Sequence, residues 1–132
     1  MSFPTRNNPP LSLRFKCMLI LALALITSAC AKLEEFPLIL PVASEPSATL
    51  HNERGIAEFK KGNYLEASLH FNQALTADRT TGEIHFNMGL ALHMRGEHDR
   101  AREHLREAVK YAKGDEKILN SALVKSYLGP EP

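Results

Sequence analysis

The sequence predicts an all-α fold, a short α-solenoid made of two helical hairpins and a C-terminal capping helix. Two observations lead to this class. From residue 48 onward the chain repeats itself at an offset of 34 residues, a length that suits one pair of antiparallel helices. Apolar residues in the same region recur at helical spacing, between turn and capping residues. Five helices are expected, over residues 48–61, 64–77, 83–95, 98–112 and 116–128.

Length and composition limit the function further. A chain of 132 residues has room for one compact domain and a targeting segment, which excludes a two-domain enzyme. Its 44% apolar and 23% charged residues are near globular averages, so most of it is expected to fold. Three basic residues and no acidic ones precede position 30, which leaves 13 basic and 15 acidic residues in the rest. Without a net positive charge there, no nucleic-acid partner is expected.

The N-terminal residues have the parts of an export signal. Residues 1–16 are polar and basic, residues 17–26 are uncharged and largely apolar, and small residues follow. The uncharged stretch from Cys17 to Ala31 has 15 residues, fewer than the roughly 20 that a helix needs to span a bilayer. These features predict a signal peptide over residues 1–29 that is removed, and no permanent transmembrane helix.

Small residues followed at once by a cysteine, Ser28-Ala29-Cys30, resemble the lipobox of bacterial lipoproteins. The resemblance implies that Cys30 becomes the first residue of the mature protein and carries lipid on its thiol and amine. Thr27 departs from the pattern, which usually has Leu there. Ala31, in place of an Asp after the cysteine, implies the outer membrane, facing the periplasm, in a cell with two membranes. Ordinary cleavage after Ala29, with Cys30 left free, is the alternative.

Residues 30–47 are expected to form a tether between the lipidated cysteine and the domain. They contain three prolines and no helical period, a composition that favours extended chain. Cys17 leaves with the signal, so no internal disulfide is expected in the domain. The run 36–40 is unusually apolar for a tether, and packing on the domain, contact with lipid and a dispensable patch are all open.

The two repeat units, residues 48–81 and 82–115, carry small residues at matching positions and resemble the tetratricopeptide repeat. The resemblance implies that these residues mark the contact between the two helices of a unit. The repeat-packing residues are then Gly55, Ala67, Phe71, Ala74, Gly89, Ala101, Leu105 and Ala108. His51 and His85 stand where the family usually has a large aromatic residue. Residues 116–132 are expected to form the capping helix and tail.

In this family the first helix of each unit lines a concave groove that binds other proteins. The resemblance places a partner-binding groove at Asn52, Ile56, Phe59, Lys60, Phe86, Leu90, His93 and Met94. Its mainly apolar side chains suit an amphipathic helix or an extended apolar segment of a partner. The alternative is that several of these side chains belong to the core, covered by the linker or by a second copy of the chain.

Six histidines raise the question of a metal site. No two of them are three or four residues apart, the spacing that puts two ligands on one helix face, so neither a metal nor a cofactor is expected. No Ser-His-Asp or Cys-His arrangement stands out, and an enzyme is not expected.

These features together predict a lipid-anchored, periplasm-facing adaptor or assembly factor that binds another envelope protein. A second hypothesis is a self-associating structural lipoprotein, a homo-oligomer without a separate client. A third is an envelope protein that carries a metal or another ligand.

Overall fold

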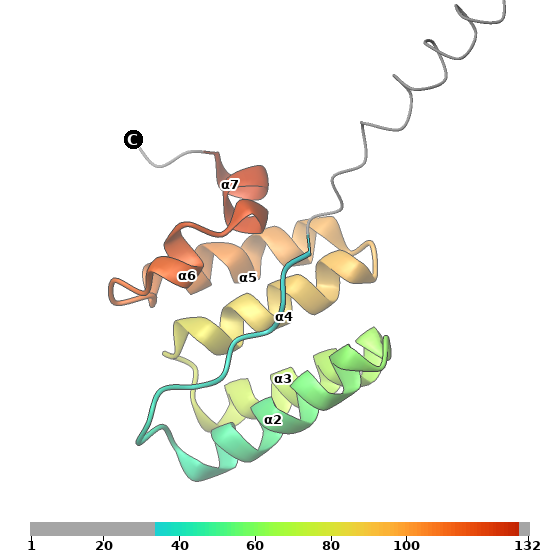
Figure 1. The fold of residues 1–132 in the computed structure, drawn as a ribbon, viewed down its shortest axis with the longest axis vertical. Coiled ribbons are helices and arrows are strands. Elements are labelled where there is room, and N and C mark those ends of the chain that lie inside the picture. Colours follow the sequence, from blue (N-terminus) through green and yellow to red (C-terminus); the bar gives the residue numbers. More distant parts are fainter. Residues whose placement is uncertain (1–33, 130–132) are drawn as a thin grey trace, which may run out of the picture. The chain divides into compact units, whose positions relative to one another are not determined.

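All regular secondary structure in the computed structural model, which describes residues 34–129, is helical. Two antiparallel hairpins lie side by side, and two short helices follow them (Figure 1). The helices are α2 (Pro46–Lys60), α3 (Tyr64–Ala77), α4 (Gly82–Met94), α5 (His98–Lys110), α6 (Glu116–Leu119) and α7 (Ala122–Leu128). This arrangement confirms the predicted all-α class. The expected signal peptide and Cys30 lie outside the described residues.

In each hairpin, the two helices approach each other closely at a glycine of the first helix. A Cβ atom at Gly55 of α2 would lie 2.6 Å from Cδ1 of Phe71 on α3, so any other residue would push the two helices apart. A Cβ at Gly89 of α4 would meet Cγ of Leu105 on α5 at 2.9 Å. The turns between the helices use glycines in the left-handed region, Gly62 and Gly96, with φ of +82° and +78°. The same packing solution therefore recurs 34 residues apart.

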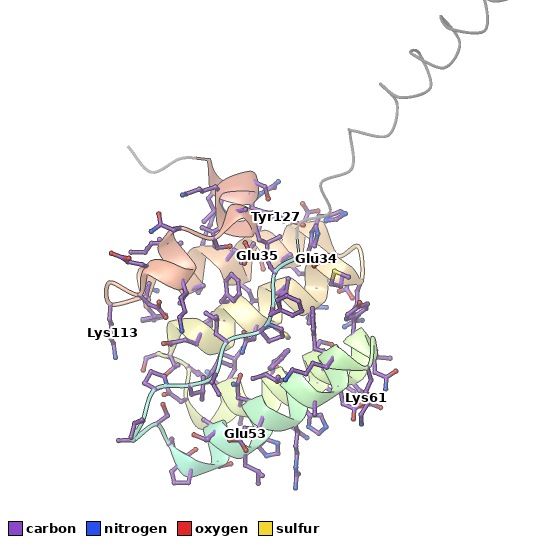
Figure 2. The ribbon with its side chains drawn as sticks, viewed as in Figure 1. Glu34, Glu35, Glu53, Lys61, Lys113 and Tyr127 are labelled. Carbon is purple, nitrogen blue, oxygen red and sulfur yellow. The ribbon has the colours of Figure 1, made fainter. Side chains whose placement is uncertain are left out.

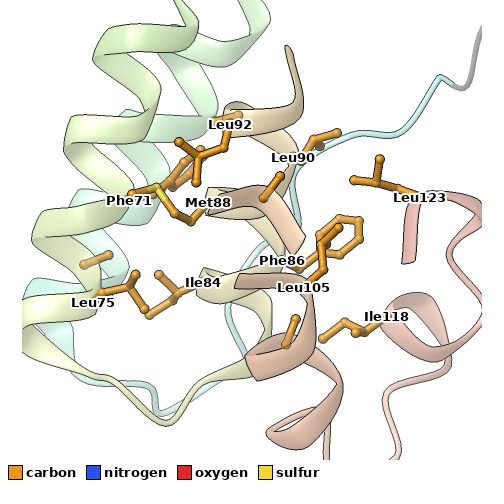
Figure 3. Packing of buried hydrophobic residues seen from close by; sticks show 14 of the residues in the cluster. Phe71, Leu75, Ile84, Phe86, Met88, Leu90, Leu92, Leu105, Ile118 and Leu123 are labelled. Carbon is orange, nitrogen blue, oxygen red and sulfur yellow. The ribbon is translucent and has the colours of Figure 1, made fainter. Parts of the chain in front are cut away.

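Helix α4 lies at the centre of the domain, and ten of its 13 residues are buried. Ile84, Met88 and Leu92 lie toward Phe71 and Leu75 of α3, as Figure 3 shows. Two further apolar side chains of α4, Phe86 and Leu90, lie on the side of Leu105, Ile118 and Leu123. A helix that is apolar on nearly all sides is expected to be buried on all sides. The two hairpins and the C-terminal helices thus share one core.

The C-terminal segment differs from the single capping helix expected over residues 116–128. It forms α6 and α7, separated at Asn120 and Ser121. Ser121 has extended backbone angles, and its hydroxyl oxygen accepts a hydrogen bond from the N–H of Val124 at 3.1 Å, which starts a new helix. The bend lets both Ile118 and Leu123 reach the core, where each is almost fully buried.

Residues 34–45, here called the strap, have no regular secondary structure and lie against the helices (Figure 1). The strap runs from α7 across α4 to the start of α2, and Leu38 and Leu40 pack on the core. A tight turn follows, in which Ser44 N–H donates to the Pro41 carbonyl at 3.2 Å and Ala43 has a φ of +73°. Glu45 then caps α2 by accepting from the N–H of Ala48 at 2.6 Å. Most of the expected tether is therefore attached to the domain.

Candidate functional site

Two asparagines from different repeats meet beneath the strap. Asn52 of α2 and Asn87 of α4 both have an exposed fraction of 0%. The Nδ2 of Asn87 donates a hydrogen bond to Oδ1 of Asn52 at 2.8 Å. The shared contact fixes the orientation of both side-chain amides, because each atom of the pair has a defined donor or acceptor role. A buried, oriented polar pair thus lies beside the apolar core.

The side-chain amides of this pair also hold the backbone of one strap residue, Leu38. The N–H of Leu38 donates to Oδ1 of Asn87 at 2.6 Å. The carbonyl oxygen of Leu38 accepts from Nδ2 of Asn87 at 2.7 Å and from Nδ2 of Asn52 at 3.0 Å. Both polar groups of a single peptide residue are therefore bound, as in an extended peptide held by a receptor.

Loss of the strap would remove three of the four hydrogen bonds that these amide groups make. A buried donor or acceptor that loses its hydrogen bond costs about 1–3 kcal/mol. Asn87 would lose one contact in which it donates and one in which it accepts, and Asn52 would lose a contact in which it donates. The pair therefore favours an occupant that offers an N–H and a C=O at the same residue. We call the surface of α2, α4 and α7 that carries the strap the strap-binding face.

A second polar anchor holds the strap three residues earlier. Oε1 of Glu35 accepts hydrogen bonds from the hydroxyl of Ser121 at 2.9 Å and from the N–H of Leu123 at 3.1 Å. Glu35 and Tyr127 of α7 lie at the same end of the domain (Figure 2). Because Ser121 and Leu123 mark the start of α7, this anchor connects the strap to the C-terminal helix as well as to the repeats.

The side chains of the strap divide into an inner and an outer set. Leu38 and Leu40 are half-buried against the core. Phe36 and Ile39 point outward, with 65% and 74% of their surface exposed. The prolines in the strap help to keep it extended, because the residue before a proline avoids helical angles. Phe36 and Leu40 are both in that position.

The eight residues predicted to line a partner-binding groove occupy four different environments. Asn52 contacts the strap directly. Phe86, Leu90 and Phe59 are buried in the core, and Ile56 packs on its edge. His93 contacts Tyr127, whereas Lys60 and Met94 are exposed. The structure therefore brings only part of this set to the strap-binding face.

Sequence reasoning missed Asn87, Glu35 and Ser121, the other residues that hold the strap. The sequence does contain an indication for Asn87, because this amide lies within the apolar run from Ile84 to Leu92. Buried amides are normally hydrogen-bonded, so such a residue needs a polar partner. For Glu35, 86 residues away from Ser121, no local pattern indicates the contact.

The six histidines form three side-by-side pairs. His51 pairs with His70, and 34 residues later His85 pairs with His104, with ring centroids 6.2 Å and 5.5 Å apart. His93 and His98 form the third pair, at 5.6 Å. The two members of each pair come from the two helices of one hairpin. Their separation in the sequence hides this pairing, because the partners face each other across antiparallel helices.

The pair in the second hairpin is connected by hydrogen bonds. Nε2–H of His85 donates to the carbonyl of Arg79 at 3.0 Å, because a carbonyl oxygen can only accept. Nδ1 of His85 lies 3.2 Å from Nδ1 of His104, so one of these two atoms donates and the other accepts. Burial, with smaller contributions from His85 and Arg100, lowers the pKa of His104 to about 4, although Glu107 opposes the shift. His104 is therefore uncharged near neutral pH.

The third pair holds α7. The hydroxyl of Tyr127 lies 2.8 Å from Nδ1 of His93 and 2.6 Å from Nδ1 of His98. A hydroxyl has one hydrogen, so it can donate to at most one of the two rings, and at least one ring donates to it from Nδ1–H. Burial and then the nearby His98 lower the pKa of His93, and burial raises the pKa of Tyr127. The cluster attaches α7 to both helices of the second hairpin.

Over residues 34–129, no three histidine, cysteine, aspartate or glutamate side chains converge in a way that would hold a metal ion. None of the helices in the same range has the length and apolar character needed to cross a membrane.

Stacked antiparallel hairpins with a 34-residue period define an α-solenoid, a fold that presents extended binding surfaces. The chain belongs to the tetratricopeptide-repeat family, whose model, Tetratricopeptide repeat, matches residues 45–114, more than half of the chain. The match confirms the repeat assignment. Repeats of this family generally mediate protein–protein interactions, and the fold is typically a non-catalytic scaffold. No curated protein matches the chain in sequence.

Proposed function

We propose that this chain is a lipid-anchored docking module that binds another envelope protein on the periplasmic side of a membrane, as an adaptor or assembly factor. The observation that carries the proposal is the asparagine pair, because Asn52 and Asn87 hold both polar groups of an extended peptide residue. This is the chemistry of a peptide receptor and not of a catalyst. The repeat family supports a protein as the partner.

The anchor is proposed at Cys30, within the lipoprotein-like sequence that ends the signal peptide. Glu35, the first strap residue with a polar contact to the helices, is only five residues later. Five residues of fully extended chain span at most about 18 Å. A lipid on Cys30 would therefore hold the domain directly at the bilayer surface, where membrane-bound partners are concentrated.

Acylation is tested by labelling cells that express the full chain with a palmitate analogue. Label is expected in the wild type and in Cys17→Ser, because Cys17 leaves with the signal, and it is expected to be lost in Cys30→Ser. Label in Cys30→Ser, or a wild-type protein that fractionates away from membranes, would contradict the anchor.

Docking is tested separately by placing a photo-crosslinking amino acid in the full chain at Met94, an exposed position on α4. The matched control carries it at Arg106, which is exposed on α5. A discrete adduct with a membrane protein from position 94 alone is expected. Equal adducts from both positions, or none from either, would argue against docking beside the strap-binding face.

The first hairpin supports self-association as a second candidate. Leu65 and Leu69 of α3 are four residues apart, so they share a helix face, and both are more than half exposed. The equivalent positions in α5, Asp99 and Glu103, are polar and exposed, so the apolar pair is particular to the first hairpin and suits a contact with a second copy. Sedimentation should then show a dimer that Leu65→Lys with Leu69→Lys dissociates and Glu66→Lys does not. A wild-type monomer would exclude this candidate.

A further inference from the structure

The strap is the part of the chain whose role the repeat fold does not explain. Two helical hairpins need no extended segment to complete their hydrogen bonding, yet the strap makes specific polar contacts with residues from three helices. These contacts fall on two strap residues, Glu35 and Leu38, and Leu40 adds an apolar contact. The spacing of the three contacts describes the kind of peptide that the face accepts.

We propose that the strap is a built-in, displaceable ligand, and that the partner carries an extended segment with the same pattern, Glu-x-x-Leu-x-Leu. This inference rests on the proposed docking function and names its partner chemistry. In the partner segment, a carboxylate takes the place of Glu35, and two apolar residues take the places of Leu38 and Leu40. Binding of the segment releases the strap.

The backbone contacts set the strictest requirement of the pattern. Asn87 accepts from the N–H of Leu38, so a proline at this position is excluded. Asn87 and Asn52 both donate to the carbonyl of the same residue, which uses both lone pairs of that oxygen. These bonds do not depend on the side chain, so a foreign segment can make them as well as the strap does. The carboxylate three residues earlier sets the direction of the segment, because Ser121 and Leu123 lie at one end of the face.

The strap also has the properties of a removable element. None of its residues is fully buried, and the side chains of Phe36 and Ile39 face outward. The turn that joins it to α2 places Ala43 at a φ of +73°, which residues with a Cβ avoid, so release would relieve this turn. A helix of the core has no comparable freedom, because its side chains interlock with their neighbours.

Covalent attachment gives the strap an advantage over any free segment. A short linker holds its ligand at an effective concentration in the millimolar range, so a free segment binds the intact chain weakly. A substitution that weakens binding of the strap should therefore let a free segment bind the strap-binding face more tightly. The substitution Leu38→Pro removes the N–H that Asn87 accepts and leaves every helix unchanged in sequence.

The closing experiment measures binding of a fluorescent peptide with the sequence of residues 33–44 to the full chain. We expect Leu38→Pro to bind it about tenfold or more tightly than the wild type does. Ile39→Pro is the matched control, since Ile39 is exposed and its N–H has no hydrogen-bond partner within the described residues. It should bind like the wild type. A peptide that itself carries Leu38→Pro should not bind. Failure of the unaltered peptide to bind a Leu38→Pro chain with native helicity would overturn the proposal.

Hydrogen exchange on the wild-type chain keeps the test independent of any variant that does not fold. If the strap opens on its own, the amide of Leu38 should exchange faster than the amide of Leu90 within α4. Exchange of both amides only by global unfolding would overturn the proposal, because the strap would then be a fixed part of the fold. A wild-type dimer that Leu38→Pro dissociates would instead assign the face to the strap of a second copy, and would overturn the partner assignment.

These outcomes are separable from the docking function itself. A discrete adduct from Met94 together with no peptide binding would retain a partner and reject this recognition pattern. Peptide binding without any adduct would retain the pattern and leave the docking proposal contradicted.

Discussion

The two hairpins follow the same 34-residue pattern and yet differ greatly in burial. Helix α2 buries four residues, whereas the equivalent helix α4 buries ten. Both have a glycine against the partner helix and a histidine paired across the hairpin. The difference comes from neighbours, because α4 contacts α3, α5 and α6 while α2 lies at the edge. In a solenoid, the position of a repeat in the stack decides how much of the surface of each residue is buried.

The histidine pairs show the same effect. In the second hairpin, His85 and His104 form a hydrogen bond, and His85 also donates to the Arg79 carbonyl. In the first hairpin, the rings of His51 and His70 stack further apart, and Nδ1 of His51 is buried without a hydrogen-bond partner among the described residues. Equivalent sequence positions therefore have different electrostatic surroundings.

The largest expected effect comes from alanine at equivalent apolar positions, Leu90 in α4 and Ile56 in α2. Leu90→Ala should lower the free energy of unfolding by about 3–4 kcal/mol, because it opens a cavity in the core. Ile56→Ala should lower it by about 1–2 kcal/mol, since this side chain is half-buried and solvent can enter. Urea unfolding of both variants measures the difference. Equal losses of unfolding free energy in the two variants would mean that the position of a hairpin in the stack does not control how much a buried side chain stabilises the fold.

Alanine at the two helix-contact glycines should have the next largest effect. We expect Gly55→Ala to cost about 2–3 kcal/mol, because the new methyl group would meet the rigid ring of Phe71. Gly89→Ala should cost about 1–2 kcal/mol, because the nearest atoms belong to the Leu105 side chain, which can rotate away. Thermal unfolding compares the two. A larger loss at Gly89 would show that the crowded surroundings of α4 outweigh the stiffness of the contacting side chain.

Acid should weaken the second hairpin through His104. Its pKa is about 4 in the folded chain and about 6.5 when unfolded, so the unfolded state takes up the proton first as the pH falls. The contribution of uncharged His104 to the free energy of unfolding is therefore fully present above about pH 6.5, and it decreases as the pH falls toward 4. Because the ring is only half-buried, we expect a loss on the order of 1–2 kcal/mol.

NMR titration of the His104 ring, with urea unfolding at pH 7 and pH 4.5, tests this effect. The His104→Asn variant should show a smaller acid-induced loss than the wild type. A ring that titrates near pH 6.5 in the folded chain would contradict the expected effect of burial on its pKa.

The smallest effect is expected where both hairpins face solvent. Leu65 of α3 is 56% exposed, and its repeat equivalent in α5 is the exposed Asp99. Replacing Leu65 by the residue of the second hairpin, Leu65→Asp, should change the free energy of unfolding by less than about 0.5 kcal/mol. A clear destabilisation in urea, found only at high protein concentration, would show that this face is covered by a second copy.

Much of the fold could be predicted because it depends on local and periodic signals. The 34-residue offset and the helical spacing of apolar residues predicted both hairpins within a few residues of their observed bounds. The division of the last helix could not be predicted in this way. Residues 116–128 have apolar spacing suited to one helix, and the break arises because Ser121 caps α7 and also donates to Glu35.

The candidate site was less accessible to sequence reasoning. Asn52 was included because of its repeat position, whereas Asn87, one residue beyond the next equivalent position, was not. The apolar run at residues 36–40 indicated that the tether was unusual, but several explanations fitted it. Choosing among them required knowing that two asparagines from different helices meet at Leu38.

The sequence by itself determined the all-helical class, the repeat period, the close-contact glycines and the glycine turns, because each depends on residues near one another or on a strict period. Only the tertiary structure decided which histidines pair, where the C-terminal helix divides and what lies on the strap-binding face. Apart from the His93–His98 pair, these features join residues from 14 to nearly 90 positions apart, such as Asn52 with Leu38 and Ser121 with Glu35. Such contacts exist only once the helices have packed, because packing brings buried polar groups within reach of partners that satisfy their hydrogen bonds.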